Sequence, residues 1–391
     1  MFQPVRTNFQ SCCIIGQCCN KGGTVELMRY LPLSTVVAVK RINLDNYDTN
    51  GFAEELELLQ TELCVSRQLS HPNVLYYHLA FVSGTELLMV SPLMAFGSCQ
   101  DLIQNHFVGG LPELAIALIL RDVLLGLEYI HKKGFIHRAI RASHILVSSS
   151  GRACLSGLRY SYNIVRDGRR VNTVHSFPNS TQKNLNWLSP EVLEQNLKGY
   201  NESSDIYSIG ITLCELANGV EPFSGMPTTL MLMEKVRGSV PQLLDVSTVS
   251  FFKEYGFSPQ PCGLLCEDEV TEEEEEDEIR VSVEHIGYGD TVASARYEQR
   301  RAMLERTLSE AFHDLTQLCL LREPSARPTA AQLLQHQFFK QCRRASQHLP
   351  DLLRPVLPLT DNRTASYGDP ELLFVSESLS DLEIAPLKWN F

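Results

Sequence analysis

A long apolar stretch that carries charges at helical spacing constrains the fold more than any other part of the chain. Residues 114–130 read LAIALILRDVLLGLEYI and include Arg121, Asp122 and Glu128. A membrane-spanning helix needs about 20 mostly apolar residues with few charges. We therefore predict a helix that is buried in a protein core and does not span a membrane. A chain of 391 residues is long enough for two lobes and a large core.

The composition is that of an ordinary soluble protein, with 44% hydrophobic and 20% charged residues. The formal net charge of −12 argues against binding to nucleic acid or to an anionic membrane, because both need a basic surface. The first ten residues, MFQPVRTNFQ, lack the apolar core of a signal peptide.

Twelve cysteines raise the alternatives of disulfides or a zinc site. Eight of them are scattered from Cys64 to Cys342, and no Cys-x-x-Cys pair occurs. The other four lie near the N-terminus, but no His or further Cys follows them at the spacing of a zinc finger. We favour reduced thiols in a cytosolic protein over metal ligation. The four N-terminal cysteines are Cys12, Cys13, Cys18 and Cys19.

The segment at residues 136–159, IHRAIRASHILVSSSGRACLSGLR, has the layout of the catalytic loop and metal-binding turn of a protein kinase. A kinase loop reads His-Arg-Asp-Leu-x-x-x-Asn, in which the Asp accepts the substrate's hydroxyl proton and the Asn holds magnesium. His137 and Arg138 are present, and we expect structural roles for them. The positions of the catalytic Asp, the magnesium-binding Asn and the magnesium-binding Asp of the Asp-Phe-Gly turn are Ala139, His144 and Gly157. We therefore predict no catalytic residue and no metal site.

Residues 36–42 are rich in β-branched side chains and contain a lysine, a pattern typical of a central strand. Within them, VAVK matches the kinase strand whose lysine pairs with nucleotide phosphates and with a glutamate on a helix. Residues 52–69 have the pattern of an amphipathic helix, and Glu62 lies where the partner of Lys40 is expected. We predict a Lys40–Glu62 pair; a surface position for Glu62 is the alternative.

Gly23 and Val25 fit the end of the glycine loop that covers the phosphates in kinases, but Gly16 lies two residues too far away. Cys18 and Asn20 fill the remaining glycine positions, so the loop is longer and poorer in glycine than that of an active kinase. Bulkier residues keep backbone N–H groups from a close approach to phosphate. A plain hairpin is the alternative. The nucleotide-binding residues predicted in the small lobe and hinge are Ile15, Gly16, Gly23, Val25, Ala38, Lys40, Glu62 and Met94.

From Asp101 onward the pattern is helical, as expected of a larger second lobe. Ser-Pro-Glu at 189–191 stands where kinases have Ala-Pro-Glu, and Arg327 is the expected buried ion-pair partner of Glu191. Asp205 begins an apolar helix. We predict an α+β, bilobal protein-kinase fold. It comprises a mainly β N-lobe at 9–91, a hinge at 92–98 and a mainly α C-lobe at 99–345.

Two segments depart from this pattern. Seven consecutive acidic residues at 272–278 repel one another, so we predict a disordered insertion at 258–302. We favour a solvated loop there over docking to a basic partner. Residues 346–391 are rich in Pro and Ser and predict a flexible tail. Because solvated aromatic side chains are costly, we expect Trp389 and Phe391 to bind a pocket on a partner.

These motifs together resemble the STRAD pseudokinases, the sterile-twenty-related kinase adaptors. The resemblance covers residues 9–355 without the insertion, and LSGLR together with WLSPE are its most specific elements. It implies ATP binding without phosphotransfer, and activation of a kinase of the liver kinase B type. It also implies a helical-repeat scaffold of the calcium-binding-protein-thirty-nine family that binds a C-terminal Trp-Glu-Phe, which here reads Trp-Asn-Phe. We expect a cytoplasmic protein that also enters the nucleus.

Three side chains are expected to replace magnesium as counter-charges to a triphosphate, with Lys40 as a fourth. Guanidinium groups fit phosphate and stay charged, whereas a histidine contributes fully only when phosphate keeps it protonated. The three side chains are Arg141, His144 and Arg159. The alternative is that the two arginines are surface charges and the pocket is empty. A divergent serine/threonine kinase and a nucleotide-independent scaffold remain as alternative functions.

Overall fold

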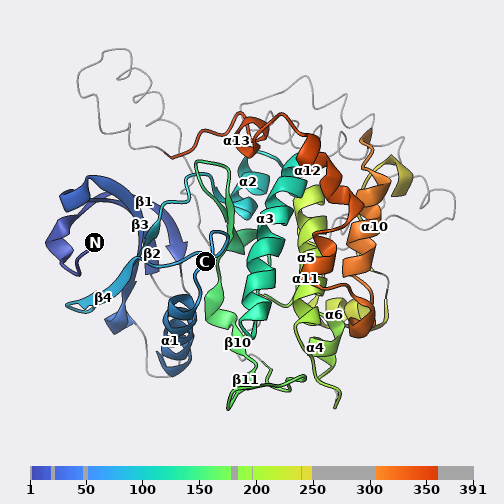
Figure 1. The fold of residues 1–391 in the computed structure, drawn as a ribbon, viewed down its shortest axis with the longest axis horizontal. Coiled ribbons are helices and arrows are strands. Elements are labelled where there is room, and N and C mark those ends of the chain that lie inside the picture. Colours follow the sequence, from blue (N-terminus) through green and yellow to red (C-terminus); the bar gives the residue numbers. More distant parts are fainter. Residues whose placement is uncertain are drawn as a thin grey trace, which may run out of the picture.

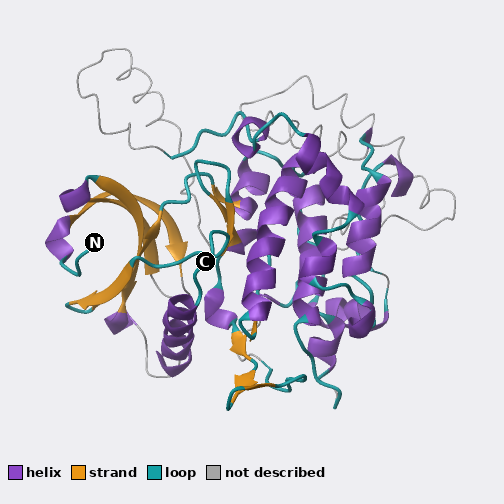
Figure 2. Cartoon of the chain, in the orientation of Figure 1, coloured by secondary structure: helices purple, strands orange, loops and turns teal. Residues whose placement is uncertain are grey.

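The computed structural model describes residues 2–18, 23–46, 52–177, 184–195, 197–238, 240–248 and 305–359. It has two lobes: a small one built on a curved sheet and a larger one built from helices (Figure 1). The predicted bilobal fold, with a mainly β N-lobe and a mainly α C-lobe, is confirmed (Figure 2).

The N-lobe is a five-stranded antiparallel sheet with the strand order β1-β2-β3-β5-β4. Its central strand carries Lys40, and the alternation of side chains puts Val37 and Val39 on one face and Ala38 and Lys40 on the other. The strands are β1 (Phe9–Cys18), β2 (Gly23–Tyr30), β3 (Thr35–Asn43), β4 (Leu79–Ser83) and β5 (Glu86–Pro92). Short 3-10 turns are Arg6–Asn8, Leu31–Leu33 and Leu44–Asn46.

Helix α1 (Phe52–Gln68) lies beside this sheet, on the side of the larger lobe (Figure 1). The predicted helix at 52–69 is confirmed to within one residue. Helix α1 also contacts the C-lobe turn η5 (Leu158–Tyr160). It therefore joins the two lobes at a second place, outside the hinge.

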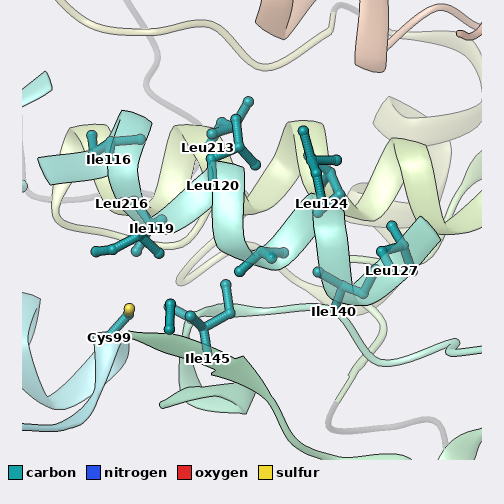
Figure 3. Packing of buried hydrophobic residues seen from close by; sticks show 14 of the residues in the cluster. Cys99, Ile116, Ile119, Leu120, Leu124, Leu127, Ile140, Ile145, Leu213 and Leu216 are labelled. Atoms are coloured by element: carbon teal, nitrogen blue, oxygen red, sulfur yellow. The ribbon is translucent and has the colours of Figure 1, made fainter. Parts of the chain in front are cut away.

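The C-lobe core forms around two helices, α3 (Glu113–Lys132) and α5 (Ser203–Asn218). Figure 3 shows Ile116, Leu120 and Leu124 of α3 packed towards Leu213 and Leu216 of α5. The prediction that the apolar stretch at 114–130 is a buried helix is confirmed, and no helix in the described part of the chain could cross a membrane. Ser98 and Asp101 cap the neighbouring helix α2 (Cys99–Asn105) reciprocally.

The described residues of the C-lobe form further, shorter helices around this core. They are α4 (Pro190–Glu194), α6 (Thr228–Arg237), α10 (Glu310–Cys319), α11 (Ala330–Leu333), α12 (Lys340–Arg344) and α13 (Leu349–Leu352). The 3-10 turns are η4 (Ala142–His144), η5, η8 (Pro324–Ala326) and η9 (Gln337–Phe339). Short strands are β6 (Gly97–Ser98), β7 (Phe135–Ile136), β8 (Ile145–Val147), β9 (Ala153–Leu155), β10 (Tyr162–Asn163), β11 (Val165–Arg166) and β12 (Arg169–Arg170).

The predicted insertion at 258–302 lies outside the described residues, but its two flanks are joined. The backbone N–H of Leu308 donates to Asp245, and His313 Nε2 lies 2.8 Å from the same carboxylate. Arg306 donates to the carbonyls of Gly109, Ala217 and Leu244. The described residues on either side of the gap, up to 248 and from 305, therefore lie next to each other on the C-lobe.

The predicted tail boundary at 346 needs correction. Helix α13 packs on the C-lobe core, where Leu349 is buried and Leu353 has no exposed surface. The chain then continues as residues 353–359, here called the strap, to a contact with the hinge. The composition suggested flexibility, but these leucines are buried against the core, and burial outweighs the entropy of ordering the chain. Residues 360–391 lie outside the described part.

Candidate functional site

Lys40 and Glu62 form a buried ion pair between the central strand and α1, with 2.9 Å between Nζ and Oε2. The hydroxyl of Tyr77 donates to the other carboxylate oxygen. Burial alone would raise the pKa of Glu62, but the charges of Lys40 and Arg159 outweigh it and hold the pKa below its usual value. Glu62 is therefore ionised, and it fixes α1 against the sheet.

Arg159 binds α1 from the opposite lobe. Its Nη2 lies 2.9 Å from Oε1 of Glu55 and its Nε lies 3.5 Å from Oε2 of Glu62, and the residue is 4% exposed. In this structure Arg159 has these two carboxylates as counter-charges. Its approach to phosphates together with Arg141 and His144 stays a prediction, which would require Arg159 to leave them. Glu55 gave no signal in the sequence, since only the fold brings residues 55 and 159 together.

His144 and Gly157 occupy the two positions that hold magnesium in kinases, and they lie against each other. A Cβ placed on Gly157 would lie 2.7 Å from Nδ1 of His144, closer than real Cβ contacts allow. Gly157 also has a φ of +81°, a left-handed conformation that glycine adopts without strain. The imidazole thus fills the space that an aspartate side chain at 157 would need.

His144 is neutral in this environment. Burial and the nearby charge of Arg141 together lower its pKa well below the usual value. Nδ1 lies 2.6 Å from the carbonyl of Ala139, and because a carbonyl accepts only, Nδ1 must carry the proton. Nε2 then faces Arg141 as an acceptor at 3.5 Å. His144 therefore carries no positive charge here, and a nearby anion would be needed to make it the predicted counter-charge.

Arg141 is buried below the lobe junction, with its guanidinium carbon 5.3 Å from the centre of the Trp187 ring. Burial lowers the pKa of Arg141, while the carboxylates of Glu215 and Glu221 act in the opposite direction. The alternative of a surface charge is excluded for Arg141 and Arg159, since both are buried. Trp187 and Glu215 were not found from the sequence; the WLSPE motif could have drawn attention to the former.

Asp205 holds the loop that carries the missing catalytic position. Its carboxylate accepts the backbone N–H groups of His137 and Arg138, both at 2.8 Å, and lies 2.8 Å from Nε2 of His131. Arg138 has a φ of +62° and donates from Nε to the carbonyl of Tyr160 at 2.7 Å. The strained backbone of a working loop is thus retained although the residue at 139 is alanine.

Glu191 and Arg327 form the predicted buried pair, with two nearly parallel hydrogen bonds of 2.6 and 2.9 Å. Arg327 also donates to the carbonyls of Ser203, Leu321 and Arg322. This pair joins α4 to the segment before α11, and its role is structural.

Four of the predicted nucleotide-binding residues belong to one buried cluster that spans both lobes, here called the interlobe cluster. Leu146 and Cys154 contribute to it from the C-lobe. The four residues are Ile15, Val25, Ala38 and Met94. Gly16 and Gly23 lie in the β1–β2 hairpin, where Gly16 pairs with Val25 and Gly23 with Cys18. A Cβ on Gly23 would lie 2.6 Å from the Cys18 carbonyl, so the hairpin itself requires this glycine.

The residues present fit a purine nucleotide but not magnesium. Met94 in the hinge is 4% exposed, and within the described chain no hydrogen bond engages its N–H, which leaves a buried donor for a purine ring nitrogen. Lys40 and Arg141 supply positive charge. By contrast, no group of three or more potential metal ligands occurs among the described side chains. Positions 139, 144 and 157 carry no carboxylate.

The other sequence predictions concern cysteines and the C-terminus. Cys12 and Cys13 are exposed and Cys18 is buried, whereas Cys19 lies outside the described residues. Trp389 and Phe391 lie outside the described residues.

A model of the protein kinase domain family matches residues 20–339. The STE20-related kinase adapter protein alpha of Homo sapiens is 43% identical over 392 residues, which covers 100% of this chain and 86% of that protein. The Mus musculus protein of the same name is 43% identical over 397 residues, with the same coverage. The STE20-related kinase adapter protein beta of Homo sapiens is 37% identical over 368 residues, covering 94% of this chain and 83% of that protein.

Proposed function

The chain belongs to the STE20-related kinase adapter family within the protein kinase fold, and we propose that it is a pseudokinase adaptor that activates a partner serine/threonine kinase. The single observation that carries the proposal is a contrast within one site. The residues that maintain the kinase fold are kept: Lys40 pairs with Glu62, and Asp205 binds the backbone of the catalytic-loop segment. The three residues that accept the proton or bind magnesium in kinases are replaced.

Phosphotransfer is not expected of this chain. Loss of a general base alone costs a factor of about 10²–10⁴ in rate. Here the magnesium ligands are replaced as well, and the ring of His144 fills the space beside Gly157. A divergent, weakly active kinase therefore has less support than an adaptor.

The ligand that we propose is ATP, bound without magnesium. The purine would contact the interlobe cluster and hydrogen-bond the N–H of Met94, and Lys40 and Arg141 would neutralise the phosphates. Arg159 would join them only by leaving Glu55 and Glu62. Bound ATP would supply binding energy for the closed arrangement of the lobes, limited by its preference for that arrangement.

The partners that we propose follow from the family resemblance. They are a kinase of the liver kinase B type, which would bind the closed lobes, and a helical-repeat scaffold of the calcium-binding-protein-thirty-nine family. The scaffold would take the side chains of Trp389 and Phe391. Asn390 stands where the resemblance implies glutamate. A hydrogen bond to a charged group contributes about 1.5–3 kcal/mol, so this contact would be weaker here.

A second candidate, an adaptor that needs no nucleotide, has its own support. Arg159 fixes α1 through Glu55 and Glu62 without any ligand, so the active-like position of the helix is built into the chain. Lys40→Met separates the two candidates, because Glu62 keeps Arg159 as a partner. The nucleotide-dependent adaptor loses partner activation in this variant, whereas the nucleotide-independent adaptor keeps it.

Reconstitution tests the proposed function. The partner kinase is mixed with the scaffold, with or without this chain, and phosphorylation of a peptide substrate is followed. We expect activation when this chain is present, and no incorporation of phosphate when the chain is incubated alone with ATP. Phosphorylation by the chain alone would support the divergent kinase instead.

A further inference from the structure

The strap joins the buried core of the C-lobe to the interlobe cluster. Leu353, with no exposed surface, and Val356 pack on the C-lobe core, whereas Leu359 packs on the interlobe cluster. In Figure 1 the red chain after α13 runs from the top of the C-lobe towards the N-lobe. A segment at the end of the fold thus returns to the junction of the two lobes.

The end of the strap is fixed to the hinge by a backbone hydrogen bond. The N–H of Leu359 donates to the carbonyl of Ala95 over 2.8 Å. Ala95 directly follows Met94, whose buried N–H is the donor available to a purine. The next residue, Phe96, donates its N–H to Val147 at 3.0 Å. The hinge is therefore held from the C-lobe strand β8 on one side and from the strap on the other.

The strap turns every third side chain towards the protein: Leu353, Val356 and Leu359. Leu357 is 87% exposed, while Leu359, two residues on, is partly buried against the interlobe cluster and Val356 against the C-lobe core. Two leucines separated by one proline thus have opposite environments. Packing at Leu359 is specific to its position, and Leu357 offers a matched control.

We infer that Leu359 is a positioning residue of the nucleotide site: through Ala95 and the interlobe cluster, it fixes the hinge in the shape that receives a purine ring. The inference rests on the proposed nucleotide binding and deepens it. The strap contacts the hinge, where the purine would bind. Loss of its contacts should therefore weaken the binding of ATP and of ADP by the same factor. A change at Arg141 or Lys40, by contrast, weakens ATP more than ADP, because their charges face the phosphates.

The test measures binding of fluorescent ATP and ADP analogues, without magnesium, to the full chain and four variants. Leu359→Ala removes the side-chain contact and Leu359→Pro removes the N–H donor. We expect each to weaken both analogues about three- to tenfold. Leu359→Met, which keeps the apolar volume, restores the affinity. Leu357→Ala stays within about twofold of the unmodified chain. Equal affinities of the Leu359→Ala and Leu357→Ala variants would overturn the inference.

Hydrogen exchange separates failure of the strap from failure of the proposed function. Exchange of the hinge amides at 93–98 should accelerate in Leu359→Ala and Leu359→Pro, but not in Leu357→Ala. If the unmodified chain binds neither analogue, the nucleotide proposal and the positioning role both fail, and the exchange still reports whether the strap holds the hinge. If hinge amides exchange at an unchanged rate in the Leu359 variants, the claim that the strap fixes the hinge is contradicted, whatever the nucleotide measurements show.

Discussion

The imidazole of His144 and an aspartate side chain at position 157 exclude each other. The 2.7 Å approach of a Cβ at 157 to Nδ1 leaves no space for a carboxylate beyond it. The two positions that bind magnesium in kinases are therefore sterically coupled here: the ring at the asparagine position also fills the place of the aspartate side chain. Positions 144 and 157 carry no acidic ligand for a metal ion. In addition, the ring of His144 fills the space that an acidic side chain at 157 would need.

This mutual exclusion predicts coupled effects of restoring the acidic residue. Gly157→Asp alone should destabilise the chain by about 1–3 kcal/mol, because it overpacks a buried site. His144→Asn together with Gly157→Asp should recover the part of this loss that comes from the contact, since the smaller amide frees the space, while the cost of the positive φ at 157 remains. Urea unfolding of the two single variants and the double variant gives the coupling free energy. Additive effects would mean that the contact with the ring is not the cause.

The contacts of Arg159 predict that α1 depends on a cation from the other lobe. Arg159→Gln leaves Glu55 buried without its counter-charge, and breaking a buried pair costs about 3–5 kcal/mol. Urea unfolding measures the loss, and faster amide exchange in α1 localises it. Glu55→Gln in the same chain should recover part of it.

The exposed pair Arg170–Glu202 provides the control, because its length of 2.8 Å is similar but its side chains are 41% and 34% exposed. Arg170→Gln should cost less than about 1 kcal/mol. Similar losses for Arg159→Gln and Arg170→Gln would contradict the role of the buried pair.

Because positions 139, 144 and 157 carry no carboxylate, the proposed binding of ATP should be indifferent to magnesium. ATP should raise the midpoint of thermal unfolding by the same amount in EDTA and in excess magnesium, since a ligand that binds the folded state stabilises it by mass action. Lys40→Met should abolish the shift while the fold persists, because Arg159 still pairs with Glu62. A shift that disappears in EDTA would contradict metal-free binding.

Glu215 predicts a specific dependence of stability on pH. Burial raises the pKa of this carboxyl from its ordinary 4.5 to about 7, against hydrogen bonds from the Ala142 N–H and the Trp187 indole. The folded chain therefore holds this proton more tightly than the unfolded chain does. The stabilisation is fully present below pH 4.5 and is lost as the pH rises to about 7, by an amount on the order of 3 kcal/mol.

Urea unfolding between pH 4.5 and pH 8 checks this assignment. The free energy of unfolding of Glu215→Gln should decline less over this range than that of the unmodified chain. Glu57→Gln, at an exposed carboxylate of α1, should decline as the unmodified chain does. The same decline in Glu215→Gln and in the unmodified chain would show that another group is responsible.

Motifs in the sequence were sufficient to predict two buried ion pairs of the fold. Lys40 with Glu62 and Glu191 with Arg327 follow from spacing within local patterns, and the structure forms both. The destination of Arg159 could not be predicted in the same way. Its partner Glu55 lies on another lobe, and the choice between phosphate and carboxylate depends on distances that only the fold supplies.

The strap was missed for a related reason. Helix α13 is a single turn, which is too short for a hydrophobic period to be recognised, and the sequence around it is rich in proline. Burial of Leu349, Leu353 and Leu359 becomes visible only once the C-lobe core and the hinge are in place. The predicted fold class needed no such information, because it rests on kinase motifs that are each local in the sequence, such as VAVK, the His-Arg segment at 137–138 and Ser-Pro-Glu at 189–191.

One measurement tests the central claim most directly: the activity of the partner kinase with the scaffold, with and without this chain, alongside phosphate incorporation by the chain alone. The account predicts that the chain increases partner activity and incorporates no phosphate by itself, since positions 139, 144 and 157 carry no acid. Partner activity that does not respond to the chain, or labelling by the isolated chain, would contradict it.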